Sequence, residues 1–373
     1  MNGLSSAALV LLAAALAFAN GSNDVSKGIA TLVGSGVSNF RRAVLWGSAW
    51  TVAGGLTAAF AAQGLVATFS GKGFLARPTS GATFLAAVAT GAVAWVLFAS
   101  RTGLPVSTTH AIAGALAGAA IAAQGPGALH WSAFAQRIAL PLALSPVASI
   151  ALVFAAFPLL ARGLARVEGY CVCLERRVTA ITVSPGGALT ASVFRAEAVV
   201  AADAECAASP AVAFRLPALD ALHWLSSALT SFARGLNDTP KIIALGVAAA
   251  ALLGITGLPF YVAVASAMGA GSLVAGFRVT ETLARRVTPM GPAEGFAANL
   301  VTTLLVGAAS LLALPVSTTH VSSSAIVGIG LARGDRSIHW STVREMLLAW
   351  LVTLPVAGLA AAAAFLLLST RIG

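Results

Sequence analysis

The chain has 373 residues, of which 58% are hydrophobic and only 9% are charged, and its mean hydropathy is +0.91. A soluble globular protein carries roughly 25% charged residues, so this composition excludes that class and predicts an integral membrane protein. The net charge of +10 comes from Arg and Lys residues scattered over short connections. That pattern is typical of loops beside membrane helices, and we expect no nucleic-acid partner.

Apolar runs recur along the chain at roughly the length that crosses a bilayer, about 17 to 25 residues as helix. The alternating pattern of a transmembrane barrel is missing, so we expect an all-α polytopic fold with about 10 to 12 membrane segments. In chain order the runs are Leu4–Ala19, Ala43–Phe69, Ala82–Ser100, Pro105–Gln124, Ile138–Leu160, Pro217–Phe232, Ile242–Leu253, Pro259–Leu273, Gly295–Leu314, Pro315–Leu331 and Met346–Leu368.

The first run, Leu4–Ala19, could be read as a signal peptide, because Ala-Phe-Ala at its end resembles a cleavage site. No Lys or Arg precedes it, however, and it leads directly into "NGSNDVSK", a motif whose second copy follows an internal segment. We therefore expect this run to be a helix of the mature fold.

Two motifs occur twice, in the same order and at a nearly constant offset. Gly-x-Asn-Asp-x-x-Lys occurs at 21–27 and 235–241, and Leu-Pro-Val-Ser-Thr-Thr-His occurs at 104–110 and 314–320. We interpret this as a tandem duplication. It predicts a first transporter repeat over residues 1–160, a hydrophilic linker over 161–216 that faces the cytoplasm, and a second repeat over 217–373.

The first copy carries five apolar runs. A repeat that crosses the membrane an odd number of times places the next repeat upside down, so inverted topology is favoured over parallel topology. Secondary transporters built in this way bind substrate between the repeats at the bilayer midplane, on broken helices and helical hairpins.

All three cysteines, Cys171, Cys173 and Cys206, lie in the linker. Their odd number argues against a disulfide framework, and the absence of a nearby His argues against zinc. We expect reduced thiols without a specific role.

The Ser-Thr-Thr motifs have the features of an oxyanion site. Pro105 and Pro315 suit the first turn of a new helix, where the missing N–H does no harm. The hydroxyls that follow add donors to a helix N-terminus, which favours anions. Such residues are common packing residues in membrane helices, but an identical second copy favours a site. For His110 and His320 we favour a structural role over a substrate contact.

The Asn-Asp motifs place charge at membrane depth, where an ionisable residue is by default a functional hypothesis. Asp24 and Lys27 share a helical face, as do Asp238 and Lys241, so an internal ion pair is the alternative interpretation. A carboxylate beside a bound anion repels it unless a cation or a proton lies between them. The motifs therefore predict a site, at a helix break, that binds anion and cation together.

With Gly-x-Asn-Asp and Pro-Val-Ser-Thr-Thr-His each duplicated in order, the chain resembles the inorganic phosphate transporter (PiT) family. The resemblance implies phosphate transport coupled to sodium or protons, a homodimer, no cofactor beyond possible sodium ions, and a multi-pass protein in the cytoplasmic membrane of a bacterium or archaeon. It places Asp24 and Asp238 nearer the cations. It implies the substrate residues Asn23, Ser107, Thr108, Thr109, Asn237, Ser317, Thr318 and Thr319.

Two departures from the family weaken the expectation of sodium. Lys27 and Lys241 stand where many members have Asn, and the Glu that sodium-coupled eukaryotic relatives carry in the second membrane segment is absent between Ala43 and Phe69.

Three functions follow from these observations. The first is a phosphate–cation symporter, and the second is a sulfate permease of the same family. The third is a membrane hydrolase that would use Ser107 or Ser317 with His110 or His320. Ser and His three residues apart beside Pro do not form a nucleophile elbow, so we expect a transporter and no enzyme.

Overall fold

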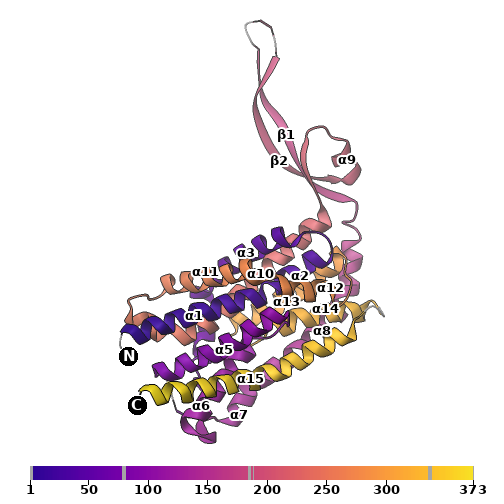
Figure 1. Ribbon diagram of the computed structural model, residues 1–373. Helices are drawn as coiled ribbons and strands as arrows, with labels where there is room; N and C mark the ends of the chain where they lie inside the picture. Colours follow the sequence, from indigo (N-terminus) through magenta and orange to yellow (C-terminus); the bar gives the residue numbers. More distant parts are fainter. Residues whose placement is uncertain (1–2, 78–80, 184–185, 188, 335–337, 373) are drawn as a thin grey trace.

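The computed structural model describes residues 3–77, 81–183, 186–187, 189–334 and 338–372. Figure 1 shows a bundle of long helices with both termini at one end and a narrow β-strand appendage projecting from the other. Among the described residues, seven helical segments are long and apolar enough to cross a membrane. The polytopic helical membrane fold predicted from the sequence is therefore confirmed.

The part of the chain before the appendage is helical throughout. Its elements are α1 (Gly3–Asp24), α2 (Ser26–Gly34), α3 (Phe40–Ala61), α4 (Gln63–Phe69), α5 (Ala82–Thr102), α6 (Thr108–Gln124), the 3-10 turn η1 (Pro126–Ala128), α7 (Trp131–Phe134), the π turn η2 (Ala135–Ala139) and α8 (Leu140–Leu164).

The part after the appendage repeats this order with fewer interruptions. Its elements are α10 (Ala218–Leu252), α11 (Leu258–Ala275), α12 (Phe277–Arg285), α13 (Pro292–Leu311), α14 (Thr318–Ala332) and α15 (Trp340–Ile372).

Corresponding helices of the two halves run in opposite directions (Figure 1). Helix α1 runs from the end that holds the termini toward the appendage, whereas α10 starts at the appendage and runs back. Helix α8 ends at the appendage, and α15 ends at the opposite end of the bundle. Opposite directions of this kind are what inverted-topology repeats require.

The predicted helix break at the second Asn-Asp motif is wrong. The runs Pro217–Phe232 and Ile242–Leu253 belong to one helix, α10, which continues through Pro240. In the first copy the break is confined to Val25, whose backbone stays helical at φ −56° and ψ −33°. A proline inside a membrane helix removes one hydrogen bond but does not end the helix where neighbouring helices support both sides.

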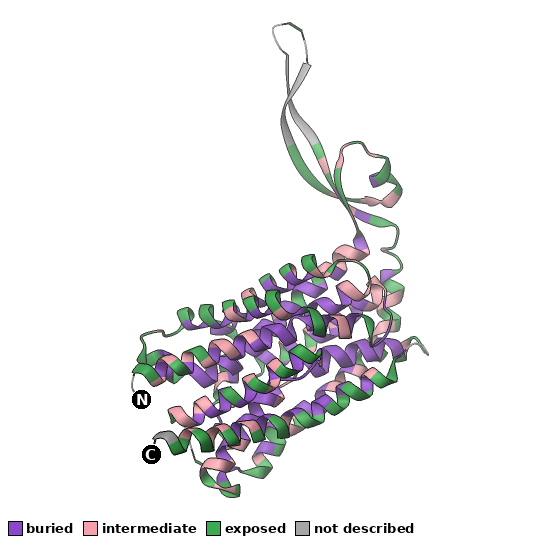
Figure 2. Ribbon diagram, viewed as in Figure 1, coloured by how far each residue is buried: buried purple, intermediate pink, exposed green. Residues whose placement is uncertain are grey.

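The outer faces of the helices are apolar and the interior holds the polar side chains. On α15, Leu348, Leu359 and Leu366 are 51%, 71% and 55% exposed, at a spacing that places them on one stripe. Figure 2 shows this alternation of an exposed outer face and a buried inner face along the long helices. An exposed leucine stripe of this length fits lipid and not water.

Small residues let the helices approach closely at the centre. A Cβ atom on Gly54 of α3 would meet the backbone of Phe232 in α10, and one on Gly114 of α6 would meet the backbone of Leu354 in α15. Close backbone approach at glycine is a common way in which membrane helices associate.

The hydrophilic linker folds into a small appendage that contains a sheet. Strands β1 (Tyr170–Val183), β2 (Leu189–Ala202) and β3 (Val212–Pro217) pair antiparallel in the order β2-β1-β3, and the short helix α9 (Asp203–Ala208) joins β2 to β3. The expectation of three reduced thiols is wrong in this structure, because Cys173 and Cys206 are joined as a disulfide. Sequence spacing could not reveal this pair, since the two residues meet only when α9 packs on the sheet.

Candidate anion-binding site

Two helical hairpins, α5–α6 and α13–α14, meet tip to tip inside the bundle. The Thr109 hydroxyl in the first hairpin donates to the Val316 carbonyl in the tip of the second at 3.2 Å. The Thr319 hydroxyl donates in return to the Val106 carbonyl at 2.7 Å. This reciprocal pair of bonds holds the two Ser-Thr-Thr motifs against each other, although they are far apart in the sequence.

Each Ser-Thr-Thr motif begins a helix, but the helix starts later than predicted. Ser107 and Ser317 are the N-caps of α6 and α14, and each side chain accepts from the backbone N–H three residues on at 3.1 Å. Pro105 and Pro315 lie in the extended segments before the caps and not in the first turn. Proline favours an extended residue before it, and serine is the stronger capping residue, so the serine sets the start.

The Asn-Asp motifs bring a cluster of charges to these hairpin tips. Asp24 lies 3.1 Å from the Lys27 ammonium, and Asp238 lies 3.1 Å from that of Lys241. Within the described residues, these four side chains and Arg234 are the buried Asp, Glu, Lys and Arg side chains. Two carboxylates against three cations give the cluster a formal net charge of +1.

The Lys241 ammonium ties α10 to both hairpins. It donates to the Thr109 hydroxyl at 2.7 Å, to the Val316 carbonyl at 3.0 Å and to the Asn237 side-chain oxygen. Lys27 is bound more locally, since it donates to the backbone and side-chain oxygens of Asn23, both at 2.9 Å. The two lysines therefore occupy corresponding positions but make different contacts.

The two aspartates share one amide donor, Asn20, which the sequence analysis did not single out. Its side-chain nitrogen donates to Asp24 at 2.9 Å, to Asp238 at 3.2 Å and to the Thr108 hydroxyl at 3.1 Å. Arg234 donates to the Asn20 side-chain oxygen at 3.4 Å and to the Thr51 hydroxyl at 2.8 Å. Because a guanidinium can only donate, Arg234 fixes which end of the Asn20 amide faces the carboxylates.

The sequence contains a pattern that could have identified Arg234 and Asn20 as residues of the site. Arg234 lies four residues before Asp238, as Asn20 lies four residues before Asp24, so the duplication aligns the two. An arginine in an otherwise apolar run at membrane depth is itself a functional hypothesis.

The predicted substrate residues fall into two groups in the structure. The hydroxyls of Thr108 and Thr318 face the charge cluster, since they approach Asp24 at 3.4 Å and Asp238 at 3.5 Å. Asn23 and Asn237 mainly hold the hairpins: Asn23 donates to the Leu104 carbonyl at 3.0 Å, and Asn237 donates to Ser310 at 2.8 Å. All eight predicted substrate residues are buried around the hairpin tips.

The histidine rings of the two motifs pack against each other in a tilted arrangement, and they do not contact the capping serines through their ring nitrogens. The His110 and His320 rings lie 4.5 Å apart, and the His320 ring lies 4.1 Å from that of Trp350. Each capping serine is bonded to a histidine backbone N–H and not to an imidazole nitrogen. The arrangement has no Ser–His pair of the kind a hydrolase needs.

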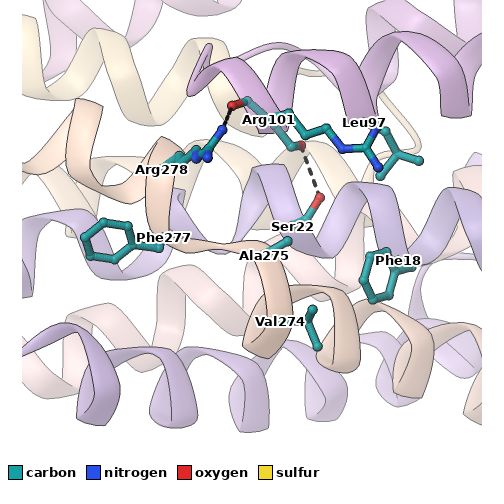
Figure 3. A pocket seen from close by; sticks show the side chains of 9 residues that line it. Phe18, Ser22, Leu97, Arg101, Val274, Ala275, Phe277 and Arg278 are labelled. Carbon is teal, nitrogen blue, oxygen red and sulfur yellow. Dashed lines mark hydrogen bonds between the residues drawn. The ribbon is translucent and has the colours of Figure 1, made fainter.

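A cavity of about 590 Å³ opens beside the first hairpin, between α1, α5 and the junction of α11 with α12. Figure 3 shows Ser22, Arg101 and Arg278 at its wall, with Arg278 donating to the Arg101 carbonyl. The Ser22 hydroxyl donates to Ser100 at 3.1 Å, and Ser100 also accepts from Asn23 at 3.3 Å. The cavity is thus lined mainly by apolar side chains, carries two arginines, and adjoins the Asn23 side chain through Ser100.

Comparison with known proteins identifies the family. Residues 20–361 match the model of the phosphate transporter family. Proteins of Bacillus subtilis (strain 168) and Rhizobium meliloti (strain 1021), each named a "probable low-affinity inorganic phosphate transporter", are 29% and 27% identical over 371 and 372 residues. The matches cover 97% and 95% of this chain, and 96% and 93% of those proteins.

The fold is also similar to a solved structure. A chain described as "The sodium-dependent phosphate transporter" matches with a TM-score of 0.76 at 20% identity, over 98% of this chain and 99% of that one. Members of the matched family are transporters and not enzymes. The chain is a multi-pass membrane protein and belongs to the phosphate transporter family.

Proposed function

We propose that the chain moves inorganic phosphate across the cell membrane together with protons. The observation that carries this proposal is the meeting of two hydroxyl-rich helix N-termini with a buried cluster of net charge +1. Helix N-termini supply donors and a partial positive charge, and the cluster adds the lysines and Arg234. Phosphate has the tetrahedral acceptor geometry that donors arriving from two opposed hairpins fit.

The contacts of the aspartates favour protons over sodium. One oxygen of each carboxylate faces a lysine ammonium at 3.1 Å, and the other accepts from the Asn20 amide. A sodium ion needs oxygen lone pairs that point at it, and here a lysine ammonium lies against one oxygen of each carboxylate and the Asn20 amide against the other. An ammonium at the same carboxylate would also repel a second cation.

A proton on either aspartate couples cation and anion binding. Protonation raises the net charge of the cluster from +1 to +2, which complements the phosphate dianion. It also removes the repulsion between two carboxylates that share one amide donor. Binding of the proton therefore raises the affinity for phosphate, and binding of phosphate raises the affinity for the proton. This reciprocal coupling is what symport requires.

Uptake into proteoliposomes tests the proposal. The purified chain is reconstituted, and labelled phosphate is followed under an inward proton gradient at equal sodium, and under an inward sodium gradient at equal pH. We expect accumulation only with the proton gradient, and weak competition by sulfate, which carries no proton at neutral pH. Accumulation driven by sodium at constant pH would refute proton coupling, and strong competition by sulfate would favour the sulfate permease.

A further inference from the structure

The three cysteines of the appendage form one buried cluster. Cys171 and Cys173 lie on β1 and Cys206 lies on α9, and their exposed fractions are 0%, 1% and 4%. The three sulfur atoms all lie within 4.8 Å of one another, and those of Cys171 and Cys173 are 3.3 Å apart. Two come from alternate residues of one strand, which point to the same face of the sheet.

A carboxylate lies next to the cluster. Burial and, after it, the neighbouring Asp203 carboxylate at the start of α9 raise the pKa of the Cys171 thiol. The same carboxylate is held by Arg215 of β3 at 3.2 Å. Three sulfur ligands thus converge from β1 and α9. With the neighbouring Asp203 carboxylate as a candidate fourth ligand, they are of the types that a tetrahedral zinc site uses.

Among the side chains of the appendage that the structure describes, the cysteines form the buried apolar cluster. The apolar side chains packed on the cysteines are those of Ala201 and Val212. Units with so small a core are generally held by a disulfide or by a bound metal ion. Both chemistries are open to this cluster: Cys173 and Cys206 are joined in the structure, and Cys171 is a free thiol.

The distribution of basic residues indicates which chemistry applies in the cell. The helix ends that lie near the appendage in Figure 1, which are the start of α3 and the ends of α8, α12 and α14, carry Arg41, Arg42, Arg162, Arg285 and Arg333. At the other end, the connection between α4 and α5 together with η2 carries Lys72, Arg77 and Arg137. An excess of Arg and Lys marks the cytoplasmic side of a membrane protein. Disulfides are rare in that reducing compartment, where a cysteine cluster is more often a metal site.

We propose that the reduced appendage binds one zinc ion through Cys171, Cys173, Cys206 and Asp203. Reduction of the disulfide by a thiol or phosphine takes up two electrons and two protons and gives two thiols. The three thiols then bind the metal as thiolates and release three protons. The metal would join α9 to β1. In the sheet Cys171 of β1 pairs with Pro217 of β3, and Pro217 immediately precedes the first residue of α10.

Metal titration of the full-length chain in detergent tests this site. The protein is reduced anaerobically with a phosphine and titrated with Co²⁺, and bound Co²⁺ is then displaced with Zn²⁺. We expect one Co²⁺ per chain, with a thiolate-to-cobalt charge-transfer band and the strong visible bands of a tetrahedral site. Cys171→Ser, Cys173→Ser and Cys206→Ser should each weaken binding by at least roughly tenfold.

The fourth ligand has its own readout. Asp203→Asn should shift the visible Co²⁺ bands and weaken binding, while Ser209→Ala, a control in the same appendage, should change neither. Because a cysteine variant could fail to fold, the folded wild-type chain is also alkylated after reduction, and it should then bind no Co²⁺. Reduced wild-type protein that lacks the charge-transfer band, or full binding after alkylation, would overturn the proposal.

Discussion

Removing the charge of Asp238 tests the central ion pair most directly. In Asp238→Asn the Lys241 ammonium keeps its bonds to Thr109 and Val316 but loses the carboxylate at 3.1 Å. Coulomb's law at an effective dielectric constant of about 20 gives about 5 kcal/mol for two unit charges at that separation. Breaking a buried pair by removing one partner costs about 3–5 kcal/mol, so we expect a large fall in thermal stability.

The double variant Asp238→Asn/Lys241→Gln separates stability from coupling. It removes both charges, so most of the lost stability should return. Proton-driven accumulation should stay absent in the single and double variants, because neither retains the Asp238 carboxylate. Asp24→Asn and Asp24→Asn/Lys27→Gln form the matched set in the other half.

Two measurements on the same samples decide the outcome. Thermal unfolding in detergent reports the ion pair, and labelled-phosphate uptake under an imposed proton gradient reports coupling. Recovery of gradient-driven uptake in both double variants would refute the coupling role and leave the aspartates as structural residues.

Three further changes test the hydroxyl motifs, the appendage and the packing of α3 on α10. Replacing Ser107–Thr108 with Ala-Val should weaken phosphate binding in a folded protein, measured by calorimetry, and the same change at Ser317–Thr318 should do so too; one silent pair would contradict a two-sided site. Replacing residues 170–216 with a short flexible join should leave phosphate affinity unchanged, and its loss would place the appendage in the site. Gly54→Val should lower thermal stability by about 1–3 kcal/mol, because the added atoms meet the α10 backbone; an unchanged melting temperature would show that the two helices separate at little cost.

Much of the helical architecture could be predicted because hydrophobic runs of fixed length are a direct consequence of bilayer thickness. The run Ala82–Ser100 falls within α5, Ala82–Thr102, and the run Pro105–Gln124 contains α6. The break expected in α10 was wrong, because polar residues lower local hydropathy without interrupting helical backbone.

The parts that could not be predicted depend on contacts between distant segments. Nothing near Asn20 in the sequence indicates that its amide bridges two aspartates from opposite halves of the chain. The Cys173–Cys206 pair likewise requires the packing of α9 on β1. The site around the Ser-Thr-Thr motifs could be predicted because a motif repeated in both halves of a duplicated chain indicates a shared site, even when no contact between the copies is known.

The difference between the two halves at Asn20 and Arg234 has a consequence for coupling. If both positions were Asn, the cluster would have no net charge, and one proton would raise it only to +1. Arg234→Asn should therefore weaken phosphate uptake. Because the Arg234 charge disfavours protonation of the nearby aspartates, its loss should also move the pH dependence of uptake toward higher pH, whereas Arg234→Lys should retain the wild-type profile because it retains the charge. The two variants are compared by initial rates of uptake measured across pH, and thermal unfolding of each variant checks that it is folded. A loss of the same size and the same pH profile in both variants would show that Arg234 acts through its shape and its bond to Thr51, and not through its charge.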